Sequence, residues 1–243
     1  MAELYIGTSG WSYRHWRECF YQKTAQTDWL KFYAERFNAV EINGTFYRLQ
    51  RASTFEKWHE ETPAAFMFAL KANRYLTHHK KLKDPENSVL IEKQHAESLN
   101  GKLSAVLWQL SRQFKKDLPR LEGFIEALRE WPETRHVIEF RHASWFADDT
   151  ADRLTRAGIA VCQSDAGDWP LWYRVTTDLV YIRLHGRPQT YASSYSETEL
   201  THWADKIEEW RHQCKSVHVY FDNDAGCAAP FNAQFLKNLT LNR

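Results

Sequence analysis

Short runs rich in β-branched and aromatic residues alternate with longer stretches of helical periodicity along nearly all of the 243-residue chain. Parallel strands need a crossover segment between them, and an α-helix is the usual one, so this alternation predicts strand–helix units and a parallel sheet. Eight strands are expected, over residues 4–7, 39–43, 66–71, 105–110, 136–140, 159–165, 179–185 and 217–222.

Stretches of helical period follow most of these strands. The clearest runs from Glu197 to His212, where Ser196 and Glu199 match a capping box and apolar residues recur every three or four positions. Further helices are expected to start near residues 28, 53, 86, 119, 148 and 230, and residues 166–178 offer little helical period. With no internal repeat or linker, the simplest fold is α/β: a single (β/α)8 TIM barrel spanning residues 1–243.

The charge balance narrows the classes of function. The chain has 32 Lys and Arg against 31 Asp and Glu, so its formal net charge is +1. This balance argues against the broad basic surface of a general nucleic-acid coat, although it leaves room for a local basic patch. The hydrophobic share of 43% provides a sizeable core and excludes a disordered chain.

The cysteines and the absence of long apolar runs bear on location. The four cysteines lie far apart, form no Cys-x-x-Cys pair and are too sparse to staple a chain of this length: Cys19, Cys162, Cys214 and Cys227. We therefore predict reduced thiols. With neither a signal-peptide pattern nor an apolar stretch of about 18 residues, a cytoplasmic protein with no membrane partner is expected.

Polar residues occupy alternate positions near the carboxyl ends of several predicted strands. In residues 40–43 the apolar side chains have to face the helices, which turns Glu41 and Asn43 toward the barrel interior. The same alternation turns Glu139, Arg141, Tyr181, Arg183, His185, His218, Tyr220 and Asp222 inward, and Lys71, Gln109 and Asp165 end or adjoin three further strands. Any one of these groups could be a structural ion-pair member, but the whole set predicts a functional pocket at this rim.

The loops beyond the strands add groups suited to an anion. Residues 7–11 (GTSGW) combine two glycines with the hydroxyls of Thr8 and Ser9. Barrels often bind phosphate with the loops after strands seven and eight, and Arg183, Arg187 and the Gly226 turn fit that use. A phosphate or other anion site is therefore expected, against a purely loop-closing role for the glycine turn.

The same residues also bear on whether the site could take a metal, a sugar or a nucleic-acid base. Rim carboxylates and histidines are metal-ligand types, but no tight ligand motif occurs, and neighbouring cations disfavour a divalent metal. In the large clan of barrel glycosidases, the two catalytic carboxylates lie on strands four and seven. Here those strands end in Gln109 and in Arg183 with His185, which argues against a glycosidase of that clan. Tryptophans at helical spacing are assigned to packing, which leaves Trp11, Trp108 and Trp145 as candidate faces for stacking on a base or sugar.

Seven segments in order along nearly the whole chain resemble the YecE-like proteins of the domain-of-unknown-function family seventy-two. They are residues 7–13 (GTSGWSY), 40–48 (VEINGTFYR), 68–72 (FALKA), 106–110 (VLWQL), 139–145 (EFRHASW), 181–186 (YIRLHG) and 219–224 (VYFDND). The resemblance implies a TIM barrel. A likeness of this family to endonuclease-like and sugar-isomerase-like barrels implies a role connected with phosphate or nucleic acid, and the resemblance carries no catalytic residues over.

Our first hypothesis is an enzyme, a hydrolase or isomerase of unknown substrate, that acts on an anionic, phosphate-bearing small molecule or nucleic-acid end. Lys71, Arg141 and Arg183 hold the anion, while the general base is Glu41 or Glu139 and the general acid is His185. Further substrate contacts are expected from Thr8, Ser9, Asn43, Gln109, Asp165, Asp222, Asn223, Trp11 and Trp145.

Two alternatives remain open from the sequence. One is a non-catalytic module that binds single-stranded or damaged nucleic acid, with Trp11 and Trp145 as stacking faces. The other is a metal-dependent hydrolase or isomerase. The two differ in their tests, since the first predicts binding that weakens steeply with salt and the second predicts a metal in the purified protein.

Overall fold

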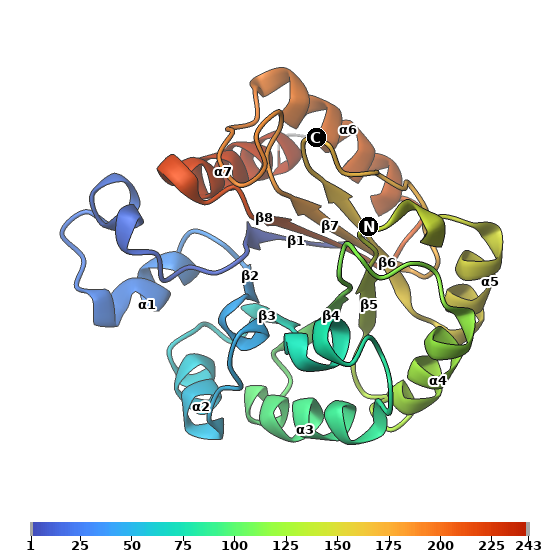
Figure 1. Ribbon diagram of the computed structural model, residues 1–243. Helices are drawn as coiled ribbons and strands as arrows, with labels where there is room; N and C mark the ends of the chain where they lie inside the picture. Colours follow the sequence, from blue (N-terminus) through green and yellow to red (C-terminus); the bar gives the residue numbers. More distant parts are fainter. Residues whose placement is uncertain (1, 242–243) are drawn as a thin grey trace.

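Eight parallel strands form the centre of the computed structural model, which describes residues 2–241 (Figure 1). Their order is β1-β8-β7-β6-β5-β4-β3-β2. The ring closes between β1 and β2, where Ser9 bridges Glu41 and the Gly10 N–H donates to the Glu41 carbonyl at 2.7 Å. The strands are β1 (Glu3–Thr8), β2 (Ala39–Ile42), β3 (Met67–Lys71), β4 (Leu103–Gln109), β5 (His136–Glu139), β6 (Ala160–Asp165), β7 (Leu179–Leu184) and β8 (Ser216–Phe221).

Helices surround this ring (Figure 1). They are α1 (Trp29–Ala34), α2 (Ala52–Glu60), α3 (Glu86–Ala96), α4 (Leu118–Leu128), α5 (Asp148–Ala157), α6 (Glu197–Arg211) and α7 (Ala228–Leu241). Short 3₁₀ or π turns cover Arg14–Trp16, Arg17–Tyr21, Gln26–Asp28, Gly44–Phe46, Tyr75–His79, Glu97–Leu99, Ala143–Trp145 and Ala225–Cys227. The predicted (β/α)8 barrel is confirmed, with every strand bound within two residues of its expected position. Its extent as one domain over 1–243 stays a prediction, and residues 1, 242 and 243 lie outside the described residues.

Local sequence signals explain where the helices begin. At α6, the Ser196 hydroxyl accepts from the Glu199 N–H and the Glu199 carboxylate accepts from the Ser196 N–H, which confirms the predicted capping box. At α4, the Asp117 side chain accepts from the Arg120 N–H, and Pro119 lies in the first turn, where no backbone donor is needed. No helix forms over residues 166–178, as the weak helical period there predicts.

Two apolar layers hold the barrel together. Strand side chains that point outward pack against the helices, and this layer includes the buried Trp29, Trp203 and Trp210, as their helical spacing predicts. Inside the barrel the filling combines aliphatic side chains, one cysteine and two tyrosines: Ala39, Ala69, Ala105, Leu107, Val137, Ala160, Cys162, Leu179, Tyr181 and Tyr220. The predicted inward His218 lies within this filling, against Tyr5 and Tyr181, while the charged residues of the interior gather near the strand ends.

The prediction of four reduced thiols is wrong for one pair. Cys19 and Cys227 form a disulfide with their Cα atoms 6.5 Å apart, while Cys162 and Cys214 are free. The two partners are 208 residues apart in sequence, but β1 pairs with β8, so the segments that follow these two strands meet in space. Within residues 2–241, no helix is long and apolar enough to cross a membrane.

Candidate functional site

The candidate site is built around Arg183, a fully buried residue of β7. Its guanidinium donates to Glu41 through Nη2 at 2.8 Å, to Glu139 through Nη1 at 3.0 Å and to Asp222 through Nη2 at 2.9 Å. The four residues come from β7, β2, β5 and the end of β8, where the alternation of each strand turns them inward. One cation therefore bonds three buried carboxylates near the carboxyl ends of the strands.

Glu139 accepts hydrogen bonds from more residues than the other two carboxylates do. It accepts from Arg141 Nε at 2.5 Å, from Gln109 Nε2 at 2.8 Å and from Ser164 Oγ at 2.6 Å, in addition to Arg183. Burial alone would raise the pKa of Glu139, but the charges of Arg141 and Arg183 hold it well below its usual range. Glu139 is thus a fixed negative charge with both oxygens occupied.

Glu41 is held in a similar way on the opposite side of Arg183. Ser9 Oγ donates to its Oε1 at 2.5 Å, and the Tyr181 hydroxyl donates to its Oε2 at 2.7 Å. Both oxygens also accept from the Arg183 guanidinium. Ser9 therefore has two roles. Its backbone bridges Glu41 and closes the sheet between β1 and β2, and its side chain binds the Glu41 carboxylate.

Asp222 and His185 form the part of the network nearest the mouth. His185 Nδ1 lies 3.0 Å from Asp222 Oδ2, and its Nε2 lies 3.0 Å from Ser164 Oγ. Burial would raise the pKa of Asp222, but Arg183 and then His185 keep it below its ordinary value. Among the described residues, Asp222 Oδ1 makes no hydrogen bond, so this carboxylate keeps one open acceptor.

Lys71, at the end of β3, is a buried cation without a carboxylate partner. Its Nζ donates to Asn43 Oδ1 at 3.1 Å and lies 4.2 Å from the centre of the Phe46 ring. Burial, followed by the charge of Arg183, lowers the pKa of Lys71 to about 8. In the part of the chain that the structure describes, no carboxylate oxygen comes within 4.0 Å of this amine.

Arg141 is the second cation with unused capacity. Its guanidinium lies over the Trp169 ring at 3.5 Å, and its Nη2 is buried without a hydrogen-bond partner among residues 2–241. A buried N–H without a partner costs free energy, because no hydrogen bond offsets its desolvation. Arg141 Nη2 is therefore a position where a ligand could supply an acceptor. Both cations also affect His78. Burial, followed by the charges of Lys71 and Arg141, lowers the pKa of His78 to about 4.

The structure brings most of the predicted site residues together, and they are Ser9, Glu41, Asn43, Lys71, Gln109, Glu139, Arg141, Arg183, His185 and Asp222. Asp165 is directed elsewhere, since it binds Arg187 and accepts from the Tyr195 hydroxyl at 2.9 Å. Thr8 Oγ1 donates to the Gly10 carbonyl at 2.6 Å and contacts no rim side chain of the network. These two residues support loops around the site.

Three other predicted residues have different surroundings. The Asn223 amide donates to the Ser193 carbonyl at 2.9 Å, which ties two loops together. Trp145 is fully buried, stacks on Phe140 with centroids 4.8 Å apart and offers no face to a ligand. Trp11 lines a separate hollow beside the rim.

Sequence reasoning missed Trp169 as a site residue. It lies in residues 166–178, which carry no periodicity that could assign it a direction, yet its ring centre is 4.7 Å from that of His185 and it also covers Arg141. The only available signal was position, since the segment follows the strand that ends in Asp165. Its contacts place it over both the His185 ring and the Arg141 guanidinium.

The donor set does not suit a divalent metal. Within residues 2–241, no three His, Cys, Asp or Glu side chains are placed to hold one ion. The physical reason is that Arg183 lies between the carboxylates and takes the place that a cation would occupy.

Fold and site together define a (β/α)8 barrel protein with a buried charge network and two incompletely bonded cations at its carboxyl-terminal rim. Residues 5–242 match the family described as "Protein of unknown function DUF72", and the chain belongs to this family. The resemblance seen in the sequence is confirmed.

Relatives of known sequence and structure agree with this assignment. The chain is 28% identical to the UPF0759 protein YunF of Bacillus subtilis over 97% of this chain and 94% of that protein. It is 27% identical to the UPF0759 protein YecE of Escherichia coli over 64% of this chain and 55% of that one. A DUF72 family crystal structure from Thermotoga maritima superposes with a TM-score of 0.90 at 30% identity, covering 99% of this chain and all of the other.

Proposed function

We propose that the rim binds the phosphate of a small molecule or nucleic-acid end and that the protein acts on this substrate as an enzyme. The observation that carries the proposal is the pair of buried cations with unused donors, Lys71 and Arg141. A bound anion would complete the hydrogen bonds of both, and charge-assisted bonds of this kind are the stronger ones. The pKa of His78, lowered first by burial and then by the charges of Lys71 and Arg141, fits a site where these two cations lie close together.

The network divides the roles among its members. Lys71 and Arg141 bind the anion, while Arg183, bonded on all sides, positions the carboxylates rather than contacting substrate. His185 is the proton carrier: its Nε2 lies 3.0 Å from Ser164 Oγ, and its Nδ1, which makes no hydrogen bond among the described residues, lies 3.0 Å from Asp222 Oδ2. The base role expected of Glu41 or Glu139 stays a prediction.

Anion binding is tested by calorimetric titration of the protein with inorganic phosphate at several pH values. We expect Lys71→Met and Arg141→Met each to weaken binding about tenfold or more, since each removes a charge-assisted contact. Binding to the wild type should also weaken as the pH rises through about 8, where Lys71 loses its proton, and this dependence should vanish in Lys71→Met.

The matched control is Lys93→Met, at the opposite end of the barrel, which should bind phosphate as the wild type does. Equal binding by all four proteins would remove the anion site. Turnover on a panel of phosphate esters then tests catalysis. A rate unchanged by His185→Gln would remove the role of His185 as proton carrier, and no turnover of any ester by the wild type would leave a binding protein.

The cytoplasmic location expected from the sequence remains part of the proposal. The Cys19–Cys227 disulfide counts against it, because reducing compartments keep most thiols free. Counting reactive thiols in protein denatured directly from cells decides this point: four would support the cytoplasm and two would oppose it.

A further inference from the structure

A second hollow of about 310 Å³ adjoins the rim beside the ends of β1 and β2. We call it the aromatic subsite. It is lined by Gly10, Trp11, Ser12, Tyr13, Ile42, Asn43, Gly44, Tyr47, Gln50 and Trp58. The residues come from the first two strand ends, the loops that follow them and α2, so the hollow lies against the rim network without belonging to it.

Four of its ten lining residues are aromatic: Trp11, Tyr13, Tyr47 and Trp58. Trp11 and Trp58 meet edge to face, with ring centroids 4.9 Å apart and planes at 84°. Tyr47 is 63% exposed, and the Arg74 guanidinium lies 5.5 Å from the centre of its ring. An edge-to-face pair of this kind presents one ring face and one ring edge to a planar ligand, and nucleic-acid bases stack on such ring faces.

The polar groups of the subsite are few, and they include the amides of Asn43 and Gln50 and the hydroxyl of Ser12. An amide can donate and accept at once, which matches the edge of a heteroaromatic ring. A sugar would present hydroxyls around its whole rim, and these walls could satisfy few of them. The lining therefore favours a flat heteroaromatic ring over a carbohydrate.

The aromatic subsite and the anion site share one residue. Asn43 lines the subsite and also accepts from Lys71 Nζ at 3.1 Å. A ligand with its ring between Trp11, Tyr47 and Trp58 can thus place an attached phosphate at Lys71. A hollow of about 310 Å³ takes a single ring system and has no room for a base pair of a duplex.

We propose that the substrate is a nucleotide: a heteroaromatic base held in the aromatic subsite and joined to a phosphate held by Lys71 and Arg141. This inference rests on the proposed function and names its substrate class. The nucleotide is either free or the terminal unit of a single strand, and the two share the same recognition chemistry.

Calorimetric titration separates the two parts of the ligand, with inorganic phosphate, ribose 5-phosphate and adenosine 5′-monophosphate as probes. We expect the nucleotide to bind at least about fivefold more tightly than ribose 5-phosphate, the gain that stacking of one base provides. Tyr47→Ala and Trp58→Leu should abolish this gain and leave the affinity for inorganic phosphate unchanged. Tyr173→Ala, an exposed tyrosine of residues 166–178, is the control and should bind all probes as the wild type does.

The outcomes distinguish this inference from the function on which it rests. Equal affinity for ribose 5-phosphate and the nucleotide would overturn the aromatic subsite while the anion site stands. Loss of phosphate binding in Tyr47→Ala, with an unchanged melting temperature, would also overturn it, because the two sites would then be one. No binding of any phosphate probe would overturn both proposals. A 5′-phosphorylated tetranucleotide that binds as tightly as the mononucleotide would support a strand end as the source, and weaker binding would support the free nucleotide.

Discussion

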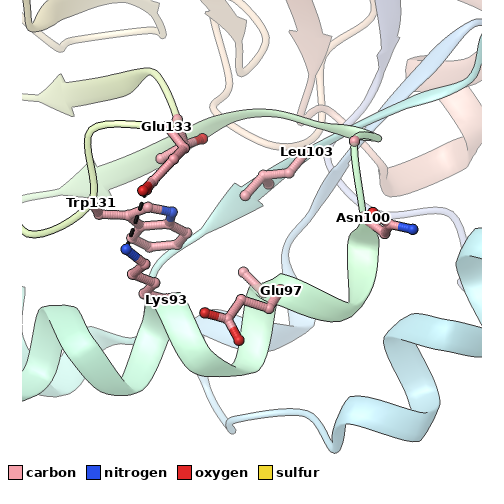
Figure 2. Close-up of a pocket in the computed structure, with 9 residues that line it drawn as sticks. Lys93, Glu97, Asn100, Leu103, Trp131 and Glu133 are labelled. Carbon is pink, nitrogen blue, oxygen red and sulfur yellow. Dashed lines mark hydrogen bonds and ion pairs between the residues drawn. The ribbon is translucent and has the colours of Figure 1, made fainter.

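The two ends of the barrel hold their charged side chains in opposite ways. Where the strands begin, a hollow of about 490 Å³ lies between α3 and the starts of β4 and β5. Figure 2 shows Lys93 and Glu133 paired beside it. Their charged atoms are 3.2 Å apart, and their side chains are 25% and 66% exposed. At the rim, where the strands end, Arg183 and the glutamates it binds are fully buried.

This difference shows that the size of a hollow is a weaker guide to function than whether its charged groups are buried and fully hydrogen-bonded. The larger hollow holds an ion pair that water solvates, and such a pair contributes little to stability. The rim holds charges out of water, where each needs several bonds to offset its desolvation. Lys71 and Arg141 fall short of that number, and this shortfall identifies the rim as the candidate site.

The largest effect is expected from Arg183→Met. The change leaves Glu41, Glu139 and Asp222 close together without the cation between them, and breaking a buried network in this way costs about 3–5 kcal/mol. Urea denaturation should show this loss of unfolding free energy. Arg183→Lys restores the charge without the planar fork and should recover part of it. A variant as stable as the wild type would place Arg183 outside the structural centre of the rim.

Strand alternation made the centre of this site predictable. An apolar residue on either side of Glu41 or Arg183 has to face the helices, so the polar side chain between them has to face inward. Parallel strands then bring their ends to one rim, which is why residues 142 positions apart, such as Glu41 and Arg183, could be expected to meet. The capping box of α6 was predictable for the same reason, since it is a local pattern.

Asp165 follows the same alternation. It ends β6, where Ser164 points inward to Glu139, so Asp165 points outward to Arg187 and Tyr195 and not into the rim. Groups outside regular strands were not predictable in this way. Trp145 follows a strand but turns back into the core on a short 3₁₀ turn. The Cys19–Cys227 disulfide depends on barrel closure, a property of the whole chain.

A smaller effect is expected from Glu92→Gln on α3. This buried carboxylate accepts from the Asn73 N–H at 2.6 Å and has no cation partner among the described residues, and burial raises its pKa to about 7. Its folded-state pKa lies above that of the unfolded chain, so its contribution to stability is lost as the pH rises from about 4.5 through 7. The difference in stability between variant and wild type should therefore change by about 3 kcal/mol between pH 4 and pH 8, in favour of the variant at pH 8.

Urea denaturation at a series of pH values measures this difference directly. The control is Glu97→Gln, an exposed glutamate one turn further along the chain, which should show no such pH-dependent difference. If Glu92→Gln tracks the wild type at every pH, the carboxylate is solvated after all. The contrast between buried and exposed charges would then fail on α3, where it is sharpest.

The smallest effect is expected from Lys93→Met, one residue further along the same helix. Lys93 pairs with Glu133 and donates to the Glu130 carbonyl at 2.9 Å, but both contacts are exposed. Solvent screening leaves such a pair little net stabilisation, so the melting temperature should fall by less than about 2 °C. The residual difference should shrink further in 1 M salt, where the Debye length is about 3 Å. A loss approaching that of Arg183→Met would mean that exposed and buried charges stabilise the two ends of the barrel equally, and the incompletely bonded cations would then no longer distinguish the rim as a functional site.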